Sequence, residues 1–165
     1  FDDYVFDIIS GILSSGRTSR FYRNIIETGI GVSVTSSNGE PGARFDNLFM
    51  IAGAPRAPHT NEELEEAIWK ELEKLKTERV EEEEFNRFLK KVDAGFIRSL
   101  RSNSGMARQL CFYEAVTGDW RYILEWREVV NSITPEDIMR VAQKYFVREN
   151  YTVAMLEREE EEGKE

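Results

Sequence analysis

Apolar side chains near the start of the chain recur every three or four positions, which is the spacing of a helix with one buried face. They predict a helix over residues 2–14, and the small residues that lead to Gly16 interrupt it. A second, shorter helix is expected to begin at a cap on Thr18 and to end at Gly29, a residue suited to a left-handed turn.

Beyond this turn the apolar period changes to two, as in a strand with one buried face. Ile30, Val32 and Val34 alternate with small or polar residues and predict a strand over residues 30–36. A glycine-containing loop follows, and the short apolar run at residues 48–52 predicts a second strand. Together the two segments indicate an antiparallel pair.

The rest of the chain has a mainly helical pattern. Helices are expected over residues 61–77, 82–100, 107–118, 123–130 and 135–146. A capping box at Thr60 and a cap with a first-turn proline at Thr134 mark two of their starts. We expect the two long helices, 61–77 and 82–100, to pair with each other, and the alternation at residues 151–156 predicts a third strand.

This order of elements indicates an α+β fold, in which several helices pack on one face of a small, mostly antiparallel sheet. The length of 165 residues supports a single domain, which we place at residues 1–156, followed by an acidic tail at residues 157–165. Because the chain begins at a helix with no strand before it, we expect it to be a fragment of a longer polypeptide.

Composition argues against several classes of function. The net charge of −9 disfavours nucleic-acid binding, and no apolar stretch is long enough for a membrane span. The single histidine, His59, and the single cysteine, Cys111, leave no self-contained zinc site, because zinc usually takes several such ligands. We therefore expect no catalytic, cofactor-binding or metal-binding residue in this chain.

A few side chains remain as candidates for chemistry, and each also has a structural interpretation. His59 precedes a predicted helix and is expected to lie in an exposed loop, with a metal or catalytic role as the alternative. Glu81–Glu84 are expected to form a solvated helix start, which the helix dipole favours. Cys111 falls on an apolar helix face, where a buried and inert thiol is the default.

Arginine side chains follow Gly16 at intervals of three, at Arg17, Arg20 and Arg23. Guanidinium groups in this arrangement could bind a carboxylate or a peptide terminus with two parallel hydrogen bonds. The alternative is that they serve packing and surface charge.

Four segments of the chain form a recognisable series. SSGRTSRFYRN at residues 14–24 is followed by GIGVSV at residues 29–34, then by RSNSGMA at residues 101–107 and ITPEDI at residues 133–138. In order and spacing these segments resemble the second half of insulinase/pitrilysin-type zinc peptidases, over nearly the whole of residues 1–156. The residues that match the family motif, expected to be structural, are Gly16, Arg17, Ser19, Arg20 and Tyr22.

The resemblance implies two similar α+β halves that enclose a peptide-binding chamber, as in the processing peptidases. Zinc is then expected in the missing N-terminal half, on an H-x-x-E-H motif, where it activates a water for peptide hydrolysis. The half that this chain resembles often supplies an arginine and a tyrosine near the zinc, but Ile25 and Val32 occupy the matching positions. These departures imply that a homologous partner subunit supplies both side chains, and Arg20 and Arg23 remain candidates for contact with a peptide substrate.

Two functions are compatible with these features. The first is a non-catalytic C-terminal domain of an insulinase-like zinc metallopeptidase, which forms the chamber and contacts the zinc-binding half and a partner subunit. The second is a structural or interaction subunit of the same fold without proteolytic activity. The compartment stays open, because cytoplasmic, bacterial periplasmic and mitochondrial locations are all compatible.

Overall fold

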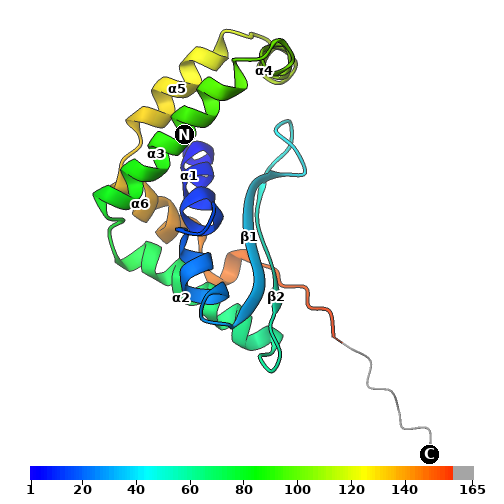
Figure 1. Cartoon of the computed structure of the whole chain (residues 1–165), viewed down its shortest axis with the longest axis vertical. Helices are drawn as coiled ribbons and strands as arrows, with labels where there is room; N and C mark the ends of the chain where they lie inside the picture. The colour runs from blue at the N-terminus through cyan, green and yellow to red at the C-terminus, as the bar shows by residue number, and fades with distance from the viewer. Residues whose placement is uncertain (158–165) are drawn as a thin grey trace, which may run out of the picture.

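The computed structural model describes residues 1–157, and helix α1 (Asp2–Ser14) lies at the centre of the domain (Figure 1). The elements that pack against α1 are β1 (Gly31–Glu40), α3 (Glu82–Ser99), α5 (Tyr122–Ser132) and α6 (Pro135–Tyr145). The apolar residues of α1 that this packing buries are Val5, Ile8, Ile9, Ile12 and Leu13. The predicted helix is confirmed, and its apolar face forms the middle of the core.

The sheet is an antiparallel hairpin of β1 and β2 (Leu48–Pro55). Its inner face lies on α1, where Ser36 Oγ donates to the carbonyl of Ser10 (3.1 Å) and Asn38 Nδ2 donates to Asp3 Oδ1 (2.8 Å). The helices therefore cover one face of a small antiparallel sheet, which confirms the predicted α+β class.

A β-bulge interrupts the hairpin ladder between Gly31 and Ser33. Gly31 and Val34 both face the core, so the two residues between them face outward, and 58% of Val32 is exposed. The prediction that Ile30, Val32 and Val34 share one buried face is thus wrong for Val32. The extra residue of the bulge shifts the alternation by one position.

Helices α2 (Asn61–Thr77) and α6 pack against each other, and each begins in a capping box, at Thr60 and Thr134 respectively. Both predicted helix starts are confirmed. The prediction that the two long helices pair is wrong, because α2 packs chiefly on α6 while α3 packs on α1. The connection at residues 78–81 turns α3 away from α2 and along α1 (Figure 1).

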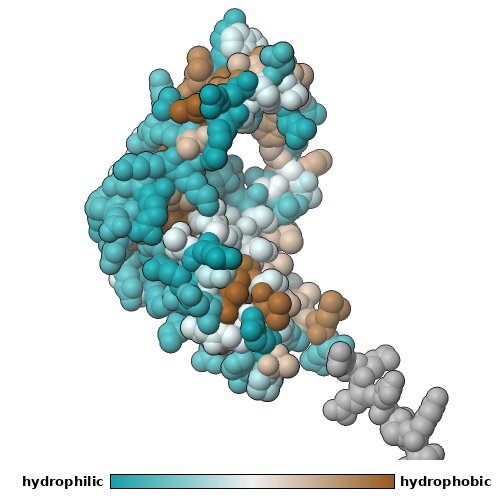
Figure 2. Space-filling model, viewed as in Figure 1, coloured by the Kyte–Doolittle hydropathy of each residue, from teal (hydrophilic) through white to brown (hydrophobic). Residues whose placement is uncertain are grey.

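Helices α3 and α5 extend beyond α1 to α4 (Asn103–Thr117), and together they form an arch (Figure 1). At the hairpin tip the Arg44 guanidinium donates to the carbonyl of Ala115 on α4, and an opening is visible between tip and arch (Figure 2). No residue of α4 is buried, and Cys111 is exposed. The prediction of a buried Cys111 is therefore wrong, because no described element covers that face of α4.

The connection from α1 to β1 contains the predicted second helix in a shortened form, because the chain is helical over residues 20–26 and not over the whole of residues 18–29. It contains a π-helical turn, η1 (Tyr22–Ile26), in which the amide of Glu27 donates to the carbonyl of Tyr22 (2.8 Å). Gly29 follows with φ of 89°, the left-handed conformation expected from the sequence.

The chain after α6 passes through a short 3₁₀ turn, η2 (Arg148–Asn150), and continues as an extended segment to residue 157. The Tyr151 ring meets Trp69 of α2 edge-on, with centroids 5.0 Å apart, and Asn61 Nδ2 donates to the carbonyl of Leu156 (3.1 Å). The predicted third strand is wrong, because this segment lies on α2 and joins no ladder within residues 1–157. Most of the predicted acidic tail, residues 158–165, lies outside the described residues.

Within residues 1–157, no helix combines the length and the apolar character needed to cross a membrane.

Gly11 sets how closely α3 can approach α1. A Cβ at this position would overlap the ring of Phe88 on α3. We expect Gly11→Ala to lower the free energy of unfolding by about 1–3 kcal/mol, because the closely packed ring must shift. Urea denaturation measures the change.

Gly95→Ala is the matched control, since Gly95 lies on α3 with nothing within 4 Å of a Cβ. It should leave stability unchanged or raise it by up to about 1 kcal/mol through helix propensity. Equal losses in the two variants would contradict the role assigned to Gly11.

Asp2 ties the start of α1 to α6 and gives stability a pH dependence. Burial tends to raise the pKa of Asp2, but hydrogen bonds from Arg140, Lys144 and Tyr145 together outweigh it and hold the pKa below its usual value. The stabilisation is therefore present above the ordinary aspartate pKa and is lost as the pH falls through the folded-state value.

Asp2→Asn should lower the free energy of unfolding by about 1 kcal/mol near neutral pH and by much less near a pH of about 2.5. Urea denaturation at the two pH values measures the difference. Asp46→Asn, at an exposed carboxylate in the hairpin loop, is the control and should show no comparable change. An Asp2→Asn effect of the same size at both pH values would disprove the linkage.

Candidate functional site

The residues that match the family motif form the junction between α1 and η1. Gly16 has φ of 87°, and its carbonyl accepts a hydrogen bond from Ser19 Oγ at 2.7 Å. A side chain at Gly16 would be strained in this conformation, and Ser19 is buried. Gly16 and Ser19 together hold the turn that leads from α1 into η1.

The side chain of Arg20 extends from this junction and pairs with Glu84 in the first turn of α3. Arg20 Nη2 lies 2.7 Å from Glu84 Oε2 and Arg20 Nε lies 3.2 Å from Glu84 Oε1, so two nitrogens of the guanidinium face the carboxylate. Only 10% of the Arg20 side chain and 16% of the Glu84 side chain are exposed. The expectation that Glu81–Glu84 are all solvated is wrong for Glu84, because Arg20 reaches it across the η1–α3 boundary.

The other motif side chains are more open to solvent. Arg17 is exposed and Tyr22 is half-buried. Half of the Arg23 side chain is exposed, and its Nη2 lies 3.7 Å from Glu84 Oε1, too far for a hydrogen bond. Of the two predicted candidates for substrate contact, Arg20 is held by Glu84, whereas Arg23 presents its guanidinium to solvent.

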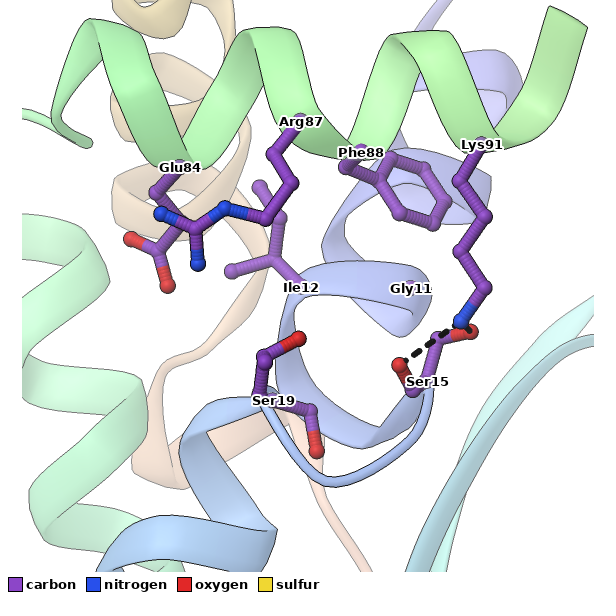
Figure 3. A pocket seen from close by; sticks show the side chains of 9 residues that line it. Gly11, Ile12, Ser15, Ser19, Glu84, Arg87, Phe88 and Lys91 are labelled. Atoms are coloured by element: carbon purple, nitrogen blue, oxygen red, sulfur yellow. Dashed lines mark hydrogen bonds between the residues drawn. The ribbon is translucent and has the colours of Figure 1, made fainter.

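A small recess of about 40 Å³ lies between the end of α1, the junction and α3 (Figure 3). Lys91 crosses it from α3 and donates to the carbonyl (2.9 Å) and the Oγ (2.7 Å) of Ser15. This volume is about that of one or two water molecules. The recess therefore joins two elements and is too small for a substrate.

The two positions where the family often carries an arginine and a tyrosine lie in different surroundings. Ile25 is completely buried beneath the sheet, and Val32 projects outward from the bulge. Neither side chain can donate a hydrogen bond. Only the position of Val32 is exposed to a molecule on the outer face of the hairpin.

His59 takes part in the N-terminal cap of α2. Its Nδ1 lies 2.7 Å from Glu63 Oε2, and this contact, with the amide of Thr60, lowers the pKa of Glu63. No group of three histidine, cysteine, aspartate or glutamate side chains within residues 1–157 is arranged to hold a metal ion. The residues present therefore do not fit the zinc that the family's peptidases use.

Sequence reasoning missed Glu84 as the partner of Arg20. The signal was present in the spacing along α3, where Glu84, Phe88 and Lys91 follow one another at intervals of four and three and so share a face. That face lies on α1 and the junction, as the contacts of Phe88 and Lys91 show. A glutamate on the same face is placed to meet a junction arginine.

Comparison with known proteins identifies the family. A family profile described as the peptidase M16 inactive domain matches residues 1–92. The match covers more than half of the chain, which therefore belongs to this family, and the resemblance to insulinase/pitrilysin-type zinc peptidases is confirmed. No curated protein sequence matches the chain.

Solved structures share the fold. A protease from Helicobacter pylori superposes with a TM-score of 0.81 at 23% identity, and the match covers 90% of this chain and 36% of that chain. A protein from Bordetella pertussis Tohama I described as a zinc protease gives 0.77 and 23%, with 92% and 83% covered. The inactive peptidase domain of a similarly described protein from Bordetella parapertussis also gives 0.77 and 23%, with 92% and 82% covered. The chain thus spans about a third of the Helicobacter chain, and at these identities the likeness shows the fold alone.

Removing Arg20 should destabilise the domain, because Glu84 would be left without its main partner in a largely buried place. We expect Arg20→Ala to lower the free energy of unfolding by about 3 kcal/mol in urea denaturation. Arg87→Ala is the matched control, since Arg87 pairs with Glu83 at the surface and should cost at most about 1 kcal/mol. Similar losses in the two variants would show that the Arg20–Glu84 pair has no special role.

Proposed function

We propose that this chain is the non-catalytic C-terminal domain of an insulinase-like zinc metallopeptidase. In this role it forms one wall of a peptide-binding chamber and packs on the N-terminal half that carries the zinc and the general base. The match of residues 1–92 to the inactive domain of the family carries the proposal. It leaves catalysis to another domain, consistent with a side-chain set here that does not fit zinc.

The outer face of the hairpin supports a role in contact with other domains. Val32, Leu48 and Met50 expose 58%, 62% and 45% of their surface on this face. Exposed apolar side chains grouped on one sheet face are a feature of interaction surfaces. We assign this face to the zinc-bearing half or to the chamber that the two halves enclose.

Two further elements of the proposal concern substrate and partner. Arg23, with its half-exposed guanidinium, is the candidate for contact with a carboxylate of the peptide substrate. Because Ile25 and Val32 stand where the family often has an arginine and a tyrosine, a homologous partner subunit supplies those groups in this proposal.

The apolar residues Ile25 and Val32 also favour a second candidate function, which is a structural or interaction subunit of this fold without proteolytic activity. The two candidates differ in the polypeptide that precedes this domain. An intact H-x-x-E-H motif there selects the peptidase, and a degenerate motif selects the interaction subunit.

The test is to produce the domain together with its native zinc-bearing half and the homologous partner subunit, then to assay cleavage of an unstructured peptide. Cleavage that a chelator abolishes, and that requires this domain, supports the peptidase. Assembly of the domain with its partners but no cleavage selects the interaction subunit. Cleavage by this chain alone would contradict both.

Met50→Lys tests the assigned surface. A charge on the hairpin face should weaken association with the zinc-bearing half by about tenfold or more, as measured by calorimetry. Met106→Lys is the matched control, because Met106 is similarly exposed but lies on α4. Weaker association for Met106→Lys than for Met50→Lys would move the interface to the arch.

A further inference from the structure

The last residues of β1 contain an asparagine followed by a glycine, Asn38 and Gly39, at a second bulge of the hairpin. The ladder pairs Asn38 and Glu40 with residues of β2 but skips Gly39, which has no partner in the register. We propose that Asn38 is a site of spontaneous deamidation, in which the backbone nitrogen of Gly39 attacks the Asn38 side chain and the product releases the end of the hairpin from α1. The proposal does not rest on the function assigned above.

Gly39 is suited to act as the attacking residue. It has φ of 96°, and no atom lies within 4 Å of the place that a Cβ would take. Attack requires its backbone nitrogen to approach Asn38 Cγ, and a residue with neither a side chain nor a register partner can turn toward Cγ with little hindrance. Both residues are only half-buried, so water also reaches them.

The reaction needs water as its only co-reactant. The nitrogen of Gly39 forms a bond to Asn38 Cγ and gives up its proton to solvent. The bond between Cγ and Nδ2 breaks, and Nδ2 takes up a proton from solvent and leaves as ammonia. Water then opens the resulting succinimide ring at either of its carbonyls, which yields aspartate or isoaspartate. The sum is hydrolysis of one side-chain amide to a carboxylate, without an oxidant or a reductant.

The atom that this reaction removes is also a donor that ties β1 to α1. Asn38 Nδ2 donates to Asp3 Oδ1 at 2.8 Å, to Asp7 Oδ1 at 3.1 Å and to the carbonyl of Asp3 at 3.2 Å. Asp3 and Asp7 lie four residues apart on α1, a spacing at which like charges repel each other. One amide group therefore bridges two carboxylates and offsets their repulsion.

The state of Asp7 shows how much this offset matters. Desolvation by the surrounding protein raises the pKa of Asp7 to about 6, the hydrogen bond from Asn38 acts in the opposite direction, and the charge of Asp3 adds to the rise. After deamidation a third carboxylate would take the place of the donor. It would repel both aspartates and could not donate a hydrogen bond at neutral pH.

The release should be confined to one end of the hairpin. Ser36 lies two residues before Asn38 on β1, and its Oγ donates to the carbonyl of Ser10 at 3.1 Å. That contact involves no group changed by the reaction. Deamidation of Asn38 should therefore free the part of the hairpin next to its tip while the part nearer the core stays on α1.

Incubation of the full chain in mildly alkaline buffer, followed by peptide mass spectrometry, tests the modification. We expect the side-chain amide to be lost at Asn38 at least about tenfold faster than at Asn103 or Asn131, both of which precede serine. Isoaspartate should form part of the product, because attack by Gly39 produces it and direct hydrolysis of the amide does not. A rate at Asn38 no faster than at the other two positions, or aspartate as the only product, would overturn the proposal.

Variants of two hairpin glycines test the attacking group. Gly39→Ala places a methyl group beside the attacking nitrogen and should slow the reaction at Asn38 by about tenfold. Gly42→Ala is the matched control, because Gly42 also has positive φ and open space around a Cβ but does not adjoin Asn38, and its rate should be unchanged. An unchanged rate in Gly39→Ala would overturn the proposal. If that variant does not fold, as judged by circular dichroism, the isoaspartate content of the parent chain decides.

Asn38→Asp reproduces one product and tests the structural consequence. Hydrogen exchange of the amides at residues 37–40 should become about tenfold faster or more, because this end of β1 no longer docks on α1. Asn86→Asp is the matched control, since it adds the same charge at an exposed asparagine of α3, and it should leave exchange in β1 unchanged. Exchange in Asn38→Asp as slow as in the parent chain would overturn the assigned release of the hairpin.

Discussion

Close packing on α1 is the constraint on which the rest of the structure depends. The hairpin, α3, α5 and α6 all contact this helix, and its buried face consists of isoleucine, leucine and valine. At Gly11 the approach of α3 leaves no room for a side chain. The junction after α1, with its turn at Gly16 and its pair between Arg20 and Glu84, then aligns η1 and α3 relative to the same helix. A larger side chain on the buried face of α1 would thus displace both the hairpin and α3.

Local signals made much of the fold predictable. Spacing of apolar residues located α1, α2, α3 and α6, and caps at Thr60 and Thr134 located two starts, because these features depend on residues within a few positions of one another. The failures involve distant segments. The bulge that turns Val32 outward, the position of Tyr151–Leu156 on α2 and the partner of each long helix depend on which surfaces meet in space. Periodicity does not carry that information.

The candidate site divides in the same way. The motif around Gly16 and Arg20 was visible in the sequence, and the family it indicated is the one to which the chain belongs. The partner of Arg20 was not identified, because four successive acids look alike in sequence until the helix face that lies on α1 is known. Glu71 shows the opposite case. It falls in a run of charged residues typical of a solvated helix, yet only 2% of it is exposed, and α2 buries it together with Leu64, Leu72 and Leu75.

The arch has a further consequence for the energetics of the domain. Helix α4 buries none of its residues, so burial of apolar surface contributes little to holding it in place. Unlike α3 and α5, which pack on α1, helix α4 can therefore open without exposing the core. Its backbone amide hydrogens should exchange with solvent through a local opening, and the free energy of this opening should lie well below that of global unfolding. The position of α4 thus depends on few contacts, chiefly those with α5 and α3.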